Sequence, residues 1–527
     1  MKKRAFLCVA LASILLSSCS SNQHPQKNII PTIVSIPEET PVEIPIQQPV
    51  LPTENSIVEV QPIPVTSTPI VTVEKKKKST PIENFANSEL LKYSNLSFYA
   101  VDLDNDKVVG DYRGENIVVP ASVMKIITSA TALEVFGANK RLETKLVSDG
   151  KIDANKVLHG NLYIIGGGDP TLGSDGIDKT NEGREKFLKD WAIAIKKAGI
   201  HSVQGDIIVI DDLFGYQGIP ESWLWEDMGT NYAPGVYGIS VFDNLYTLYL
   251  TSGAPGTKPQ IKSVKPKVKG LNFNNQSVVS RTGRKKVFVR GIPLDNDRVI
   301  LGEIPANQKT VTVKSDIPNP GLFLGQYFKD YLKNNGVIVK GDVKTSKTTN
   351  KKPKNPKVLY VTKSAPMSEI VDVLLTRSDN HYTETLFQLL RQTKNINIID
   401  YWKEKGIDVS SLVMKDGSGL SRSDYLSAKL LVDILSYMDK NSLNNSGVNY
   451  ESLFPTAGKE GTVSDFLMKK PINAKIKSGS MSGIQSYAGY VNKNGKRYAF
   501  AITVNHWDGK RSQLKKDMEN LILNTFN

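Results

Sequence analysis

Two residues three positions apart have the types needed for nucleophilic chemistry. Ser122 and Lys125 lie in an apolar segment that begins at Pro120 and has helical periodicity. On a helix this spacing places both side chains on one face, where the amine could take the proton of the serine hydroxyl. A free backbone N–H of Ser122 at the helix start could stabilise an oxyanion. The pair alone is weak, because any helix with one polar face can contain it.

A second polar motif, Ser-Asp-Asn at residues 378–380, interrupts a helical pattern. The hydroxyl of Ser378 could relay a proton, and the amide of Asn380 could hold a substrate carbonyl. The same residue types favour helix caps and loops. Taken alone, this motif therefore indicates a turn.

A third motif, Lys-Ser-Gly-Ser at residues 477–480, ends a stretch of alternating polarity that is typical of an edge strand. Lys477 could provide a cation and Ser478 a hydroxyl for a carboxylate. Gly479 would allow a substrate backbone to approach closely. Taken alone, this motif would be the basic end of a strand.

Apolar periodicity predicts the elements that must position these motifs. Helices are expected at residues 120–136, 367–390, 398–402, 428–438 and 511–523, and strands at 96–101, 107–109, 488–491 and 498–504. Between them, short apolar runs such as 161–165 and 206–210 alternate with turns and one helix, 183–198. A solvated loop is expected at 347–357. We therefore predict a discontinuous α/β domain, residues 83–145 and 364–527, split by a β-rich insert, residues 146–363.

The N-terminus carries the strongest targeting signal. Basic residues 2–4 precede an apolar run, residues 5–16, that is too short to be a good membrane span. The following Leu-Ser-Ser-Cys resembles a bacterial lipobox, so we expect a signal peptide over residues 1–18 and lipidation at Cys19. An ordinary cleaved signal peptide is the alternative. The proline-rich residues 19–82 are expected to form an extended tether.

The composition, with 39% hydrophobic and 23% charged residues, is ordinary for a globular protein. The net charge of +14 permits attraction to anionic polymers or membranes. Without zinc-finger spacing, a ribonucleoprotein motif or a Walker loop, nucleic acid is not an expected partner. The five histidines show no ligand spacing, so no metal or cofactor is expected. Cys8 would leave with the signal peptide, so no disulfide is expected.

In this order, the three motifs resemble the S-x-x-K, S-x-N and K-[ST]-G motifs of penicillin-binding proteins and β-lactamases. The long first gap is similar to that of the class C low-molecular-mass penicillin-binding proteins, the D-alanyl-D-alanine carboxypeptidase/endopeptidases, whose inserted domain lies there. The segments 119–125, 214–244, 416–421, 477–481 and 487–491 also resemble this family. The resemblance implies an α/β (α+β) transpeptidase fold with a β-rich insert. Ser478 departs from the usual Thr, with little expected effect.

The resemblance implies acyl transfer to Ser122, with a neutral Lys125 as the general base. The backbone N–H groups of Ser122 and Ser480 would form the oxyanion hole. Ser378 would return a proton to the leaving amine. Water would then hydrolyse the acyl-enzyme. β-Lactams would also acylate Ser122, but their acyl group would be released slowly.

The resemblance also implies how substrate is held. Lys477, Ser478 and Gly479 would bind the terminal carboxylate and the adjoining backbone, and Asn380 the acyl-side amide. In this family an aspartate of the insert meets the free amine of the stem peptide's diamino acid. Asp227 is the matching position, with Trp223 and Trp225 as walls.

The pKa of Lys125 is expected to lie well below its ordinary value, because partial burial and a second ammonium, Lys477, both disfavour its charge. The expected partners are peptidoglycan peptides, β-lactams as covalent inhibitors, and a membrane through an N-terminal lipid. The expected location is the cell envelope. Two alternatives stay open: a β-lactamase of the same fold, and a catalytically silent wall-binding or β-lactam-sensing lipoprotein.

Overall fold

A computed structural model describes residues 79–526 of the 527-residue chain. The predicted signal peptide, Cys19 and all but the last four residues of the predicted tether lie outside this range. Helix α1 (Pro81–Ala86) starts within those four residues. Its N-cap, Thr80, accepts a hydrogen bond from the backbone N–H of Glu83, and proline suits the first helical position.

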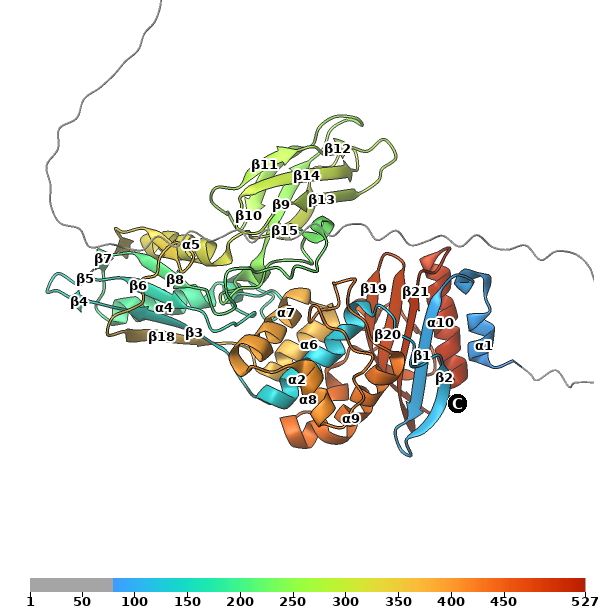
Figure 1. Cartoon of the computed structure of the whole chain (residues 1–527). Helices are drawn as coiled ribbons and strands as arrows, with labels where there is room; N and C mark the ends of the chain where they lie inside the picture. The colour runs from blue at the N-terminus through green and yellow to red at the C-terminus, as the bar shows by residue number, and fades with distance from the viewer. Residues whose placement is uncertain (1–78, 527) are drawn as a thin grey trace, which may run out of the picture. The chain divides into compact units, whose positions relative to one another are not determined.

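A five-stranded antiparallel sheet forms the centre of the main domain (Figure 1). In spatial order its strands are β19 (Asn473–Met481), β20 (Ile484–Lys493), β21 (Lys496–Asn505), β1 (Asn95–Asp102) and β2 (Lys107–Tyr112). The first hairpin thus joins the last one through the β1–β21 pair. The strand that carries the third motif, β19, is an edge strand as predicted.

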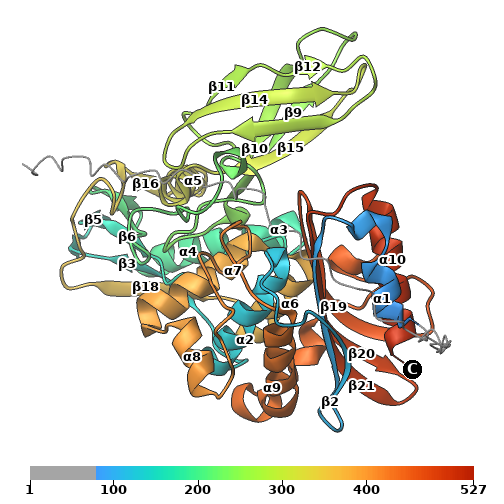
Figure 2. The same cartoon turned by 45° about the vertical axis from the view of Figure 1, so that its right-hand side comes forward.

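Helices cover both faces of this sheet (Figure 2). On one face, α1 and α10 (Arg511–Thr525) enclose a core that contains Phe500, Leu514 and Met518. The other face is covered by α2 (Lys125–Phe136), α6 (Met367–Arg377), α7 (Asn380–Gln388), α8 (Ile398–Glu404) and α9 (Ala428–Ser446). Helix α2 is buried around most of its circumference, so it forms the centre of this layer.

The chain between α2 and α6 forms the β-rich insert. Its larger sheet has the order β17 (Val343–Thr345), β8 (Ile207–Ile210), β6 (Leu162–Ile165), β3 (Glu143–Ser148) and β18 (Lys357–Lys363). A smaller sheet has the order β16 (Ile338–Val339), β7 (Ser202–Val203), β5 (Val157–His159) and β4 (Lys151–Ile152). Helices α4 (Lys186–Lys197) and α5 (Pro320–Asn334) share a core with these sheets. Strand β3 starts three residues before the predicted boundary.

Two small sheets form an outer lobe that projects from the insert (Figure 2). One has the order β10 (Gln260–Lys265), β9 (Leu245–Thr251) and β15 (Val311–Asp316). The other contains β11 (Asn272–Asn275), β14 (Asp297–Ile304) and β12 (Val278–Val279), with β13 (Lys286–Arg290) paired to β14.

Some predicted elements differ from the structure. The helix expected over residues 183–198 is interrupted at Glu185, which separates α3 (Asn181–Arg184) from α4. The expectation that the whole segment 347–357 is solvated is wrong at Lys347, whose side chain is 5% exposed and pairs with the buried Asp211. None of the helices between residues 79 and 526 has the length and apolar character needed to cross a bilayer.

Candidate active site

Ser122 lies in a 3₁₀ turn, whereas its spacing from Lys125 predicted an α-helix. The turn η2 (Ala121–Met124) leads into α2, which starts at Lys125. Three residues per turn place positions i and i+3 directly above each other. As a result, Lys125 Nζ lies 3.0 Å from Ser122 Oγ. The backbone here is held by close packing: a Cβ on Gly419 would lie 2.0 Å from the carbonyl oxygen of Ala121.

The amine of Lys125 is fully buried. In addition to the serine contact, Nζ donates to Asn380 Oδ1 at 2.5 Å and to the carbonyl oxygen of Ser418 at 2.6 Å. Burial lowers the pKa of Lys125 to about 8, against the opposing charges of Asp416 and Glu384. An amine with a pKa near neutrality is suited to accept a proton from a nucleophile.

Lys477 reaches the second motif from the edge strand. Its Nζ donates to Ser378 Oγ at 2.8 Å and to the carbonyl oxygen of Ser478 at 2.6 Å. Burial, followed by the charge of Lys125, holds the pKa of Lys477 well below its ordinary value. The expected depression of the Lys125 pKa is present, but its main cause is burial. The repulsion between the two amines appears instead in the lowered pKa of Lys477.

The second motif lies between two helices. Helix α6 ends before Ser378, whose φ of 58° is left-handed. Asp379 then caps α7 by accepting a hydrogen bond from the N–H of Tyr382 at 2.9 Å. Asn380 is the first residue of α7, and its Nδ2 donates to the carbonyl oxygen of Tyr232 at 2.7 Å. The predicted turn thus directs Ser378 and Asn380 toward the two lysines.

The third motif runs beside the nucleophile turn. A Cβ on Gly479 would lie 2.9 Å from the backbone nitrogen of Ser122 and 2.2 Å from Ser486 Oγ. That hydroxyl in turn donates to the carbonyl oxygen of Pro120 at 2.6 Å. Any larger residue at Gly479 would separate the strand from the serine. The next residue, Ser480, lines the same pocket as Ser122.

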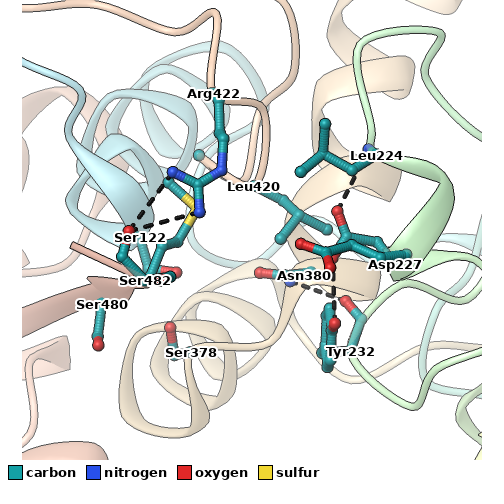
Figure 3. Close-up of a pocket in the computed structure, with 13 residues that line it drawn as sticks. Ser122, Leu224, Asp227, Tyr232, Ser378, Asn380, Leu420, Arg422, Ser480 and Ser482 are labelled. Atoms are coloured by element: carbon teal, nitrogen blue, oxygen red, sulfur yellow. Dashed lines mark hydrogen bonds between the residues drawn. The ribbon is translucent and has the colours of Figure 1, made fainter. Parts of the chain in front are cut away.

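Ser122 opens onto a pocket of about 410 Å³. The main domain contributes Ser122, Ser378, Asn380, Gly419, Leu420, Arg422, Ser480, Met481 and Ser482, and the insert contributes Leu224, Glu226, Asp227 and Tyr232. Figure 3 shows the three serines Ser122, Ser378 and Ser480 on one side and Asp227 with Tyr232 on the other. The insert therefore forms the wall opposite the nucleophile.

Asp227 reaches this pocket, but the two tryptophans expected beside it do not line it. Asp227 Oδ1 accepts a hydrogen bond from the Tyr232 hydroxyl at 3.0 Å, and Oδ2 accepts one from the N–H of Leu224 at 3.3 Å. Burial raises the pKa of Asp227. Trp225 is 65% exposed and Trp223 is buried behind the wall. The prediction for both is wrong, and Leu224 and Tyr232 line the pocket instead.

Buried carboxylates beneath the lysines were missed by the sequence analysis. Glu384, on α7, accepts hydrogen bonds from the N–H groups of Gly417 at 2.8 Å and Ser418 at 2.7 Å. Asp416 accepts from the N–H of Ser418 and from Trp223 Nε1, at 2.9 and 2.6 Å. Burial raises the pKa of Glu384 to about 8. One signal was available: Glu384 follows the Ser-Asp-Asn motif by one helical turn and so shares its face.

The insert also holds the chain on both sides of the second motif. Three residues that flank the motif are bonded to the insert: Arg377 to Asp175 (2.6 Å), Tyr382 to Ser174 (2.6 Å) and His381 to Ser240 (2.8 Å). His381 is buried, and burial lowers its pKa to about 4. A neutral imidazole at this position fits hydrogen bonding to a serine hydroxyl. The insert therefore holds the second motif in place and also forms one wall of the pocket.

Residues 79–525 match the D-Ala-D-Ala carboxypeptidase 3 (S13) family. The chain belongs to this family. It is a serine-type D-Ala-D-Ala carboxypeptidase, as the resemblance of its three motifs implied. The S13 match spans the main domain and the insert.

Two relatives found by sequence and one crystal structure agree with this assignment. The chain is 26% identical over 418 residues to the D-alanyl-D-alanine carboxypeptidase of Actinomadura sp., covering 75% of each chain. It is 24% identical over 429 residues to the D-alanyl-D-alanine carboxypeptidase DacB of Haemophilus influenzae, covering 78% of this chain and 85% of that one. The crystal structure of penicillin binding protein 4 from H. influenzae superposes with a TM-score of 0.71 at 23% identity, covering 85% of this chain and 98% of that one. The predicted fold class is confirmed.

Proposed function

We propose that this S13 enzyme removes the terminal D-alanine of peptidoglycan stem peptides by acyl transfer through Ser122. The observation that carries the proposal is the buried amine of Lys125, 3.0 Å from Ser122 Oγ, with a pKa lowered to about 8. At that pKa a useful fraction of the amine is neutral near physiological pH. The neutral amine can take the serine proton as the nucleophile attacks.

Acylation follows from the positions of these groups. Ser122 Oγ attacks the carbonyl carbon of the penultimate D-alanine while its proton moves to Lys125 Nζ. The carbonyl oxygen gains negative charge opposite the backbone N–H groups of Ser122 and Ser480. Ser378 gives its proton to the leaving amine and is reprotonated along its hydrogen bond from Lys477. The C–N bond breaks and D-alanine leaves, after which Lys125 loses its extra proton to solvent and Lys477 regains one. Water then attacks the ester carbon while its proton passes to Lys125, and that proton returns to Ser122 Oγ as the ester bond breaks.

Substrate binding changes the charges of the two lysines. The terminal carboxylate would lie at Lys477 and Ser478, with Gly479 beside the substrate backbone and Asn380 at the acyl-side amide. A carboxylate there favours the charged form of Lys477. A charged Lys477 in turn disfavours charge on Lys125, which keeps the base neutral when substrate is present. The same acyl transfer on a cross-link, whose leaving amine belongs to a second peptide, gives endopeptidase activity.

The decisive experiment is intact-mass analysis after incubation with benzylpenicillin, followed by peptide mapping. We expect one adduct on Ser122, and none on a Ser122→Ala protein that retains its circular dichroism spectrum. An adduct that persists on that variant would overturn the assignment. Rapid turnover of penicillin would identify the β-lactamase alternative. A stable adduct without release of D-alanine from any peptide would identify the sensing alternative.

We also propose that Asp227 recognises the free amine of the diamino acid. Its support is that the carboxylate is partly buried and lies in the wall opposite the nucleophile. A carboxylate facing an ammonium in such a cleft contributes about 1.5–3 kcal/mol, roughly ten- to a hundredfold in specificity.

The N-terminal sequence supports a proposal for the location of the enzyme. We propose that Cys19 is lipidated and that the proline-rich residues after it tether the catalytic part to a membrane of the cell envelope. The support is the lipobox-like run that ends at Cys19. A substrate in the cell wall requires an enzyme outside the cytoplasm.

A further inference from the structure

The outer lobe of the insert carries most of the protein's net charge. Residues 245–316, the span from β9 to β15, contain thirteen lysines and arginines against four acidic residues, a net charge of +9 out of the +14 of the whole chain. The lobe is thus far more basic than the domain that contains the motifs. A like-charged surface of this kind destabilises itself by repulsion and attracts anions.

Six of these cations lie on three segments that meet at one end of the lobe. The N–H of Gly256 donates to the carbonyl oxygen of Val279 at 2.8 Å, and the N–H of Asn307 donates to that of Gly253 at 3.0 Å. These bonds join the loop 252–258 to the segments 278–286 and 304–310, which include β12, the start of β13 and the end of β14. We name the six side chains the basic tip: Lys258, Arg281, Arg284, Lys285, Lys286 and Lys309.

The basic tip is exposed and lacks neutralising partners. All six side chains are exposed, and within residues 79–526 none of them forms an ion pair. The carboxylate of Glu303 lies at the same end, where it accepts a hydrogen bond from Ser280 Oγ. This single half-buried carboxylate does not neutralise the six positive charges of the basic tip. The basic tip can therefore bind an extended polyanion.

The lobe is joined directly to the wall of the catalytic pocket. Ser315 Oγ, on β15, donates to the carbonyl oxygen of Gly229 at 2.7 Å, and Thr230 pairs with Ser315 as an isolated β-bridge. The charge of Arg290, on β13, acts on Asp227 and favours its ionised form. The pocket wall and the basic lobe are thus continuous. The basic tip lies at the other ends of β9 and β15 from this contact, so a polymer bound at the tip must extend along these strands to reach the pocket.

We propose that the basic tip is an exosite for peptidoglycan strands, bound through the free carboxylates of their stem peptides. This inference rests on the proposed function of the pocket, because it makes the polymer at the exosite the same one that Ser122 attacks. Each stem peptide repeats the carboxylates along the glycan. Single exposed ion pairs are weak, but several on one tethered polymer act together.

Binding is tested by co-sedimentation with purified insoluble peptidoglycan at low salt, using the Ser122→Ala protein so that no cleavage occurs. Replacing all six tip residues by Gln should weaken binding at least about tenfold. A matched control replaces six exposed lysines of the main domain by Gln and should retain binding: Lys107, Lys403, Lys469, Lys470, Lys496 and Lys516. About 0.5 M salt should release the protein, because it screens exposed charges.

Chemical amidation of the peptidoglycan carboxylates distinguishes them from phosphate groups. We expect the protein not to co-sediment with amidated peptidoglycan. Equal binding to amidated material, or unchanged binding by the tip variant, would overturn the proposal. Binding to phosphatidylglycerol vesicles but not to peptidoglycan would also overturn it, by showing that the surface faces a membrane.

A kinetic measurement separates the exosite from the pocket. With Ser122 intact, the tip variant should release D-alanine from a soluble pentapeptide within about twofold of the wild-type rate, and about tenfold more slowly from insoluble peptidoglycan. Equal losses on both substrates would overturn the exosite. If neither protein cleaves the soluble peptide and penicillin does not label Ser122, the proposed function fails, while sedimentation still reports on the basic tip.

Discussion

The carbonyl oxygen of Ser418 accepts a hydrogen bond from Lys125 Nζ at 2.6 Å, across 293 positions of sequence. The N–H of the same residue donates to Glu384. One peptide segment therefore connects a buried acid to the proposed base. A carbonyl dipole orients the amine without placing a full negative charge beside it, so the neutral form of the amine remains accessible.

The pKa of about 8 for Lys125 sets the pH dependence of acylation. Because the neutral amine is the base, the rate of acylation by benzylpenicillin should rise with pH and level off above about 8. Lys125→Arg, which stays charged, should lose about 10²–10⁴-fold in rate. Stopped-flow acylation across pH 6–10 measures both. Wild-type acylation by the Arg variant would show that another group is the base.

Glu384 should affect the pH dependence of acylation. Its pKa of about 8 leaves Glu384 partly ionised where Lys125 titrates, and the ionised form favours charge on Lys125. Glu384→Gln, which can still accept both N–H bonds, should therefore move the midpoint of the acylation profile to lower pH. Glu384→Ala should instead lower the free energy of unfolding by about 1–3 kcal/mol, because it leaves the N–H of Gly417 unpaired while that of Ser418 keeps its bond to Asp416. Urea titration measures the stabilities. A Gln variant with an unshifted profile would mean that Glu384 only supports the loop.

Gly479 should not tolerate a side chain. Gly479→Ala would place a Cβ 2.9 Å from the nitrogen of Ser122, so the strand must move away and acylation should fall about a hundredfold. Gly253→Ala is a matched control, since its Cβ would meet Thr257 Oγ1 at 3.7 Å. Penicillin labelling rates compare the two. Equal rates in both variants would contradict the close approach of the strand.

Asp227 should affect the natural substrate but not the inhibitor. Asp227→Asn should lower kcat/KM about ten- to a hundredfold for peptides that carry the free amine. It should barely change acylation by benzylpenicillin, which lacks that amine. Glu226→Gln, in the same wall, is the matched control. Equal losses on peptide and penicillin would show that Asp227 is structural and that recognition lies elsewhere in the insert.

Cys19 is the proposed site of lipidation. Cys19→Ala should leave the protein unprocessed or soluble, with its peptidase activity on soluble peptides retained. Mass spectrometry of the mature N-terminus and membrane fractionation measure the change. A wild-type N-terminus without lipid, together with unchanged fractionation of the variant, would reject the anchor.

The sequence predicts the site well where chemistry is local. Ser122 and Lys125 are near each other in the chain, and their short spacing ensures contact whether the turn is α-helical or 3₁₀. The edge strand at residues 473–481 and the turn at residues 378–380 were also predictable, because alternation and capping residues are local signals. The order of the three motifs along the chain predicted the family.

The parts that sequence could not predict depend on long-range packing. Trp223 and Trp225 are two residues apart, yet one is buried against Asp416 and the other is exposed, because the wall turns between them. Lys347 lies in a polar run, and its burial depends on Asp211, 136 positions away. No local sequence pattern predicts pairings between residues so far apart in the chain.

The bonds between the insert and the ends of α6 and α7 also bear on how the enzyme is made. A ribosome completes the insert before it synthesises residues 377–382, so the partners of Arg377, His381 and Tyr382 emerge first. The second motif can then settle against a surface that already exists. We expect a chain lacking the insert to leave His381 without its serine partner and the helix start misplaced. Transplanting an insert from a distant relative would meet the same obstacle, since both sides of this contact must match.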